Sequence, residues 1–82
     1  MIELFLATLD RAVKDLGSED STTREDSINY FLAENDYMKE GCKKFAVDHE
    51  WIQREVKEIV KEKEWRKKKL IKNLTKQIRE YA

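Results

Sequence analysis

Residues 38–57 read MKEGCKKFAVDHEWIQREVK, and their small and apolar residues fall where two helices that cross at a tight turn need them. A small residue lets the two helices approach, an aromatic residue plugs the core, and an Ala-Val pair marks the turn. The inward positions of this pattern are Cys42, Phe45, Ala46, Val47, Ile52 and Val56. The pattern predicts a helix-turn-helix-like corner.

The outer face of the second helix of this corner carries polar residues that could meet the major groove of DNA. Asp48 is expected to cap the start of that helix, because a short acidic side chain accepts bonds from backbone N–H groups there. Asp48 and Glu50 would also repel a nearby phosphate backbone, so a plain helix–helix corner stays an alternative to DNA contact. The DNA-contacting residues predicted here are His49, Gln53, Arg54 and Lys57 on the second helix and Lys43 and Lys44 on the first.

The flanking sequence is helical in character, since it lacks proline and the chain has only two glycines. Apolar residues at helical spacing over residues 2–16 predict a first helix that ends at Gly17 as a C-cap. Thr22 and Glu25 have the spacing of a capping box and predict the start of a second helix. A short third helix follows from about residue 37 to residue 45. The sequence therefore predicts an all-α protein, a small four-helix domain with the helix-turn-helix-like corner and a long basic C-terminal helix.

One continuous last helix fits the sequence from about residue 49 to residue 81, because the apolar residues there fall within a stripe roughly 120° wide at 100° per residue. Such a helix would be roughly 50 Å long. Lys63 and Lys67 interrupt the stripe, which indicates either the point where the helix leaves its domain or a bend. We therefore divide the chain into a helical domain, residues 1–62, and a basic amphipathic extension, residues 63–82.

The charges of the chain cancel in total but not in distribution. Residues 1–41 carry ten acids and four bases, whereas residues 42–82 carry seven acids and thirteen bases. A basic half of this kind can neutralise phosphates or an acidic protein surface, and the opposite signs also allow head-to-tail self-association. The phosphate-gripping residues predicted in the basic half are Arg66, Lys67, Lys68 and Lys69, with Lys72, Lys76 and Arg79 following on the same helix.

The far end of the last helix also offers a surface for a protein partner. Trp65 is either a cover for lysine stems or an exposed anchor, and tryptophan is enriched among residues that dominate binding energy. The apolar stripe beyond it would dock on a partner or on a second copy of the chain. The residues predicted to bind such a partner are Trp65, Leu70, Ile71, Leu74, Ile78 and Tyr81.

Several functions find no support in the composition. The chain has no glycine-rich phosphate loop and no nucleophile–histidine constellation, so we expect neither an enzyme nor a cofactor. Cys42 and His49 are the only cysteine and histidine, which leaves no ligand set for zinc, and Cys42 is expected in the core. No stretch is apolar enough to span a membrane, and the basic start of a signal peptide is missing. We therefore expect a cytoplasmic protein.

Residues 27–36, SINYFLAEND, and residues 42–54, CKKFAVDHEWIQR, resemble a theme in small proteins encoded by bacteriophages and prophages. That theme has a short helix ending in Phe-Leu or Leu-Leu, a cysteine or alanine in the next helix, an apolar-Gly-apolar-Asp turn, and Trp or Tyr followed by Ile-Arg. In this chain Ala46 replaces the turn glycine and Gln53 intervenes before Arg54. The resemblance implies a phage origin, hence a bacterial host cell, and a helix-turn-helix-like fold.

Two functions from different classes follow from these observations. The first is a small phage-type DNA-binding regulator, expected as a homodimer, that uses the corner and the basic C-terminal helix. The second is a non-enzymatic interaction protein that binds or inhibits a host or phage protein through the C-terminal helix. The corner and the basic half favour the first function, and the acidic N-terminal half favours the second.

Overall fold

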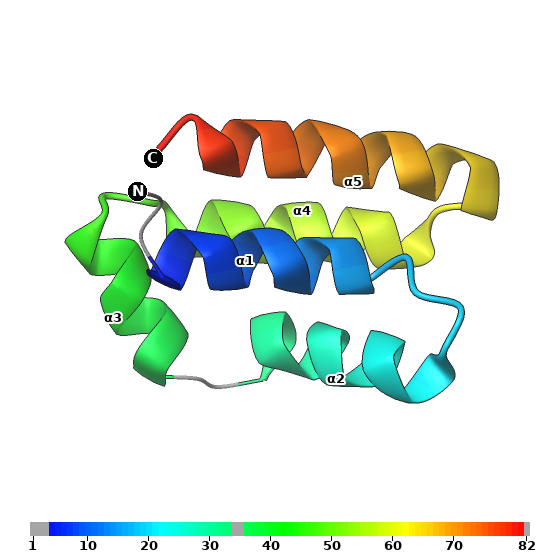
Figure 1. The fold of residues 1–82 in the computed structure, drawn as a ribbon, viewed down its shortest axis with the longest axis horizontal. Coiled ribbons are helices and arrows are strands. Elements are labelled where there is room, and N and C mark those ends of the chain that lie inside the picture. The colour runs from blue at the N-terminus through cyan, green and yellow to red at the C-terminus, as the bar shows by residue number, and fades with distance from the viewer. Residues whose placement is uncertain (1–3, 34–35, 82) are drawn as a thin grey trace.

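The computed structural model describes residues 4–33 and 36–81, and this part of the chain folds into five helices (Figure 1). They are α1 (Leu4–Asp15), α2 (Ser21–Leu32), α3 (Asp36–Lys44), α4 (His49–Lys61) and α5 (Glu64–Arg79). The prediction of an all-α protein is confirmed. Helix α5 packs beside both α1 and α4, α2 lies on the side away from α5, and α3 lies across one end (Figure 1). None of the helices described is both long enough and apolar enough to cross a membrane.

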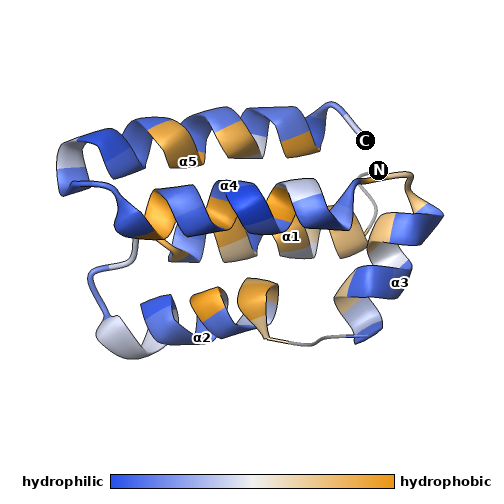
Figure 2. Ribbon diagram, turned by 180° about the vertical axis from the view of Figure 1, so that it is seen from behind, coloured by the Kyte–Doolittle hydropathy of each residue, from blue (hydrophilic) through white to orange (hydrophobic). Residues whose placement is uncertain are grey.

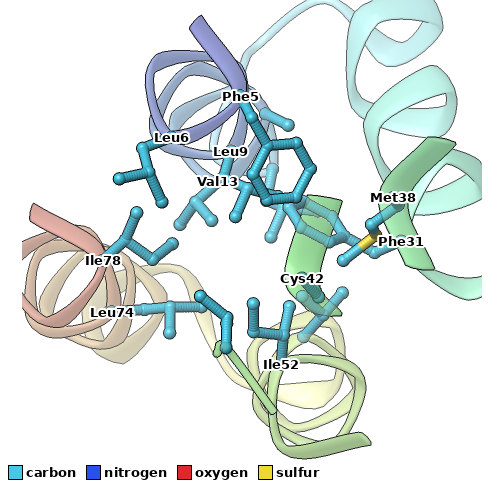
Figure 3. Close-up of a cluster of buried hydrophobic side chains, with 14 of the residues drawn as sticks. Phe5, Leu6, Leu9, Val13, Phe31, Met38, Cys42, Ile52, Leu74 and Ile78 are labelled. Carbon is cyan, nitrogen blue, oxygen red and sulfur yellow. The ribbon is translucent and has the colours of Figure 1, made fainter. Parts of the chain in front are cut away.

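Helix α1 supplies the middle of the core, because its apolar residues recur every three or four positions and form one broad buried face. Leu6, Leu9 and Val13 are fully buried, and they converge with Leu74 and Ile78 of α5 (Figure 3). The α1–α5 interface is the most extensive contact between two helices of the structure. On its other side, α1 accepts a hydrogen bond at the carbonyl of Ala12 from Ser27 Oγ of α2, at 2.9 Å.

The helix predicted over residues 49–81 is not continuous: it breaks beside Lys63, where the sequence left a bend open, and the described chain therefore has five helices where four were predicted. Helix α4 ends at Lys61, and Glu62 and Lys63 adopt extended backbone that turns the chain back on itself. A straight helix of roughly 50 Å would overshoot a molecule whose longest extent is 32 Å. It would also leave in water Leu74 and Ile78, which the turn buries to 3% and 0% exposure. Burying such a side chain contributes about 1.5–3 kcal/mol.

The segment predicted as an extension, residues 63–82, contributes α5, which packs antiparallel to α4 and shares the core with the other helices (Figures 1 and 3). Among the described residues no side chain caps the start of α5 at Lys63. The turn is therefore held by the burial of the α5 apolar residues rather than by a local capping motif.

The start of α2 differs in detail from the predicted capping box. Asp20 is the N-cap: its side chain accepts bonds from the Thr22 N–H and the Thr23 hydroxyl, both at 3.0 Å. The predicted box of Thr22 and Glu25 is wrong because the helix begins at Ser21, so both residues already lie within it. An aspartate satisfies the free N–H groups of a first helical turn as well as a threonine does.

The end of α1 was predicted at Gly17, acting as a C-cap. Helix α1 ends instead at Asp15 and unwinds through three bonds of the i→i+3 type, and Gly17 has a negative φ. The absence of a side chain at Gly17 serves packing, since a Cβ there would lie 3.0 Å from Ile71 Cδ1 of α5. The glycine thus lets α5 approach the end of α1 closely.

The turn between α3 and α4 is closed by a residue in the left-handed region, Ala46 with φ 57°. The Val47 N–H donates to the Cys42 carbonyl at 2.8 Å, and the Ala46 N–H donates to the Lys43 carbonyl at 3.3 Å. These paired bonds are those of a Schellman motif, in which the left-handed position is usually a glycine. The motif buries Val47.

The predicted N-cap of α4 is confirmed, since Asp48 accepts a bond from the Trp51 N–H at 3.2 Å. Cys42 is buried as predicted, and this burial, together with the negative charge of Asp48, raises the pKa of its thiol to about 11. The thiol is therefore protonated at neutral pH and acts as a small apolar residue.

Gly41 makes room for the ring of Phe5 at the contact between α1 and α3. A Cβ at Gly41 would lie 2.1 Å from Phe5 Cε1. The ring cannot swing aside easily, because it stacks on Phe45 at 5.8 Å between centroids and meets the edge of Tyr37 at 5.9 Å. A glycine is thus required at this position, where an apolar side chain would clash.

We predict that Ala46→Gly stabilises the protein by about 1 kcal/mol, since it relieves the cost of holding a Cβ in the left-handed region. Urea unfolding followed by circular dichroism measures the change. The matched control is Ala33→Gly, because Ala33 also follows a helix but has φ −78°. It should lower stability by about 0.4–1 kcal/mol through the greater entropy of the unfolded chain. Destabilisation by both substitutions would contradict the left-handed assignment.

We predict that Gly41→Ala destabilises the protein by about 1–3 kcal/mol, because the new methyl group overpacks the contact with Phe5. In the background of Phe5→Leu the same substitution should cost distinctly less, since the ring that it strikes is gone. A double-mutant cycle in urea measures this coupling. Equal costs in the two backgrounds would show that Phe5 does not cover Gly41.

Candidate nucleic-acid interface

The four DNA-contacting residues predicted on α4 fall into two pairs. Arg54 and Lys57 are exposed, whereas His49 and Gln53 are half-buried. Gln53 Nε2 donates to the Phe31 carbonyl near the end of α2 at 3.0 Å. This hydrogen bond connects α4 to α2. Gln53 would have to break it in order to contact a DNA base.

The solvent-facing side of α4 carries charges of both signs. Its other sides are covered, since α4 contacts α2, α3 and α5. The exposed charged residues of α4 are Glu50, Arg54, Lys57, Glu58 and Lys61. Three cations and two carboxylates on one face give only a weak attraction for phosphate.

Lys43 and Lys44, the residues predicted on the first helix of the corner, are exposed in the last turn of α3. Lysines at this end of a helix interact favourably with the helix dipole. Lys44 Nζ also lies 5.7 Å from the centroid of the Phe45 ring. Both lysines are exposed to solvent and could reach a phosphate, and both also stabilise the end of α3.

Helix α5 has the highest concentration of positive charge. Its lysines and arginines are Arg66, Lys67, Lys68, Lys69, Lys72, Lys76 and Arg79, against the single acid Glu64. Figure 2 shows the helix as alternating hydrophilic and hydrophobic bands, as expected of an amphipathic helix. Its apolar residues other than Trp65 face the core, which leaves most of the basic ones toward solvent.

The cations at the start of α5 are partly neutralised within the chain. Arg66 Nε lies 3.7 Å from a carboxylate oxygen of Glu62, and Lys67 Nζ lies 3.8 Å from one of Glu64. The Lys67 side chain is also only 13% exposed. Lys67 was predicted to grip phosphate, but its burial makes it a weak candidate.

Four lysines of α5 remain available, and we call them the α5 basic face: Lys68, Lys69, Lys72 and Lys76. All four are exposed, and none forms an ion pair with any residue in the described part of the chain. The exposed acids Glu19, Asp20, Glu25 and Asp26 belong to α2 and the loop before it. Because α2 lies away from α5 (Figure 1), these acids lie on a different side of the molecule from the α5 basic face.

The partner-binding stripe predicted along the last helix is largely part of the core. Leu74 and Ile78 are buried against α1, which corrects their prediction as partner contacts: the partner of this stripe is α1 itself. Leu70 and Ile71 are half-buried against the same core. Trp65 and Tyr81 remain exposed, Trp65 to 73%.

A groove of about 370 Å³ runs between α1 and α5, and we call it the α1–α5 groove. Its lining residues are Lys14, Gly17, Lys68, Ile71, Lys72, Thr75 and Arg79. Lys14 belongs to the acidic half of the chain and was not predicted as a binding residue. Only the return of α5 along α1 brings it to this site, so no local sequence pattern could have found it.

Asp10 connects the cations from the two helices of this groove. Its carboxylate accepts from Lys14 Nζ at 2.9 Å and from Arg79 Nε at 3.2 Å. Partial burial alone would raise the pKa of the Asp10 carboxyl. The hydrogen bonds and positive charges of Lys14 and Arg79 outweigh that effect and hold the pKa below its usual value of 3.8. Asp10 is therefore ionised at neutral pH.

Within the described residues, no group of three or more His, Cys, Asp or Glu side chains is placed to hold a metal ion. Compared with protein-family models, with curated proteins and with solved structures, the chain matches none.

Proposed function

We propose that the protein binds DNA through the phosphate backbone, with the α5 basic face as the principal contact. The observation that carries this proposal is the set of four exposed lysines without an acidic partner in the described chain. Each lysine that neutralises a phosphate releases condensed counterions, and this release drives DNA binding at low salt.

The distribution of acids supports one direction of approach. DNA that meets the α2 side encounters exposed carboxylates, whereas DNA that meets the α5 side encounters lysines. A protein with no net charge can thus bind a polyanion, because the local field rather than the total charge steers the encounter.

In this proposal the corner of α3 and α4 works as a helix-turn-helix that adds contacts beside the α5 basic face. Arg54 and Lys57 are its exposed cations on α4. The resemblance of residues 27–36 and 42–54 to small phage and prophage proteins supports a transcriptional regulator acting in the cytoplasm of a bacterial host. A homodimer would present two such surfaces to a site with two-fold symmetry.

A second function, the binding or inhibition of a host or phage protein, is favoured by Trp65. This side chain is 73% exposed at the start of α5, where a large aromatic ring gains nothing from the core. Burial of such a ring in a partner's pocket contributes strongly to binding. Leu74 and Ile78 lie in the core and cannot contact a partner. The partner-binding surface therefore consists of Trp65 and the basic residues next to it.

We predict that the protein binds random duplex DNA at low salt and that Lys68→Gln/Lys69→Gln/Lys76→Gln weakens binding at least about tenfold. The slope of log affinity against log salt should become shallower by about 0.9 for each phosphate that the variant no longer neutralises. Fluorescence anisotropy from low to physiological salt measures both quantities.

The matched control is Lys43→Gln/Arg54→Gln/Lys57→Gln, which removes the same charge from the corner. We expect a smaller decrease in affinity from it. Equal decreases would contradict the assignment of α5 as the principal contact. An absence of DNA binding by the unmodified protein at low salt would overturn the proposal and leave the partner-binding function of Trp65.

A further inference from the structure

The α1–α5 groove collects four cations from two segments that are more than fifty residues apart in the chain: Lys14 from α1, and Lys68, Lys72 and Arg79 from α5. We infer that this groove is a phosphate-binding site in which Lys14 and Arg79 close on the anion from opposite helices. The inference rests on the proposed function for its natural ligand, a backbone phosphate of DNA.

The residues that α5 places along the groove follow the period of the helix. Lys68, Lys72, Thr75 and Arg79 are spaced by four, three and four residues, so they share one face. The rise from Lys68 to Arg79 is about 16 Å. This row is long enough to follow a phosphate backbone, whose charges are spaced about 3.4 Å apart per strand along the DNA axis.

The uncharged residues that line the groove offer no free donor to an anion. Ile71 is apolar, and Gly17 has no side chain. The Thr75 hydroxyl is already used, since it donates to the Lys72 carbonyl at 2.9 Å. An anion in the groove would therefore be held by lysine and arginine side chains.

Asp10 acts as a positioning residue for two of these cations. Its side chain is only 14% exposed, yet it holds Lys14 Nζ and Arg79 Nε, whose own side chains are about half exposed. The carboxylate therefore positions the Lys14 ammonium and one edge of the Arg79 guanidinium, and the other N–H groups of both cations stay available to an anion. Counting Asp10, the groove keeps a formal charge of +3.

Arg79 retains the groups best suited to a phosphate. Within the described residues its only polar side-chain contact is through Nε to Asp10. The terminal nitrogens of the guanidinium are left to donate to two oxygens of one phosphate. Fixed on one edge and open on the other, the guanidinium is pre-organised for an anion.

The test is an NMR titration of the ¹⁵N-labelled protein with a 12-base-pair duplex and, separately, with inorganic phosphate. We expect the amide signals of Gly17 and Thr75 to shift with both ligands. In Lys14→Gln/Lys72→Gln these shifts should disappear, and the duplex should bind at least about fivefold more weakly. The control Lys69→Gln/Lys76→Gln removes the same charge outside the groove and should preserve the shifts at Gly17.

The outcomes separate this inference from the proposed function. If the duplex binds without shifting Gly17 and Thr75, and both double variants lose affinity equally, the groove inference is overturned while DNA binding stands. If the duplex does not bind but inorganic phosphate shifts these amides, the groove is a site for free phosphate and the DNA proposal fails. If the duplex does not bind and inorganic phosphate shifts neither amide, both are overturned. Amide spectra without ligand show whether each variant is folded.

Discussion

The packing of α5 on α1 is the contact on which the rest of the structure depends. No single helix of this chain buries enough apolar surface to form a core alone, and α1 is shared by α5 on one side and α2 on the other. Leu74 and Ile78 close the core only if the chain reverses after Lys61. That reversal fixes which side chains of α5 face water, and it brings Lys14 and Lys72 to the same groove.

This packing gives a chain with no net charge a strong polarity. The acids of α2 and the basic face of α5 are held apart by α1 and α4, so their opposite charges do not pair within the molecule (Figure 1). The one cross-helix ion pair of α5 described, between Arg79 and Asp10, leaves the lysines of its exposed face without acidic partners. A field of this form attracts a polyanion to one side and repels it from the other.

The features that could be predicted from the sequence are those that depend on residues close together in the chain. The helical period of α1 and the cap at Asp48 could be read directly, because both depend on residues within a few positions. The interruption of the apolar stripe at Lys63 allowed a bend there, but it did not predict that the chain reverses, because Glu62 and Lys63 form helices readily and only distant burial turns the chain back. The basic residues of α5 could be recognised in the sequence. Which of them are exposed depends on how α5 packs against the other helices. Lys14 and Asp10 were missed, since their role exists only beside α5.

The return of α5 is the central claim, and one distance tests it most directly. Spin labels can be placed by cysteine substitution at Glu50 and Lys76, which are exposed, in a background where Cys42 is replaced by alanine. Antiparallel packing of α4 and α5, with helix axes about 8–10 Å apart, predicts a dipolar distance below about 25 Å. A continuous helix would separate the two positions by about 39 Å, and a distance near that value would contradict the account.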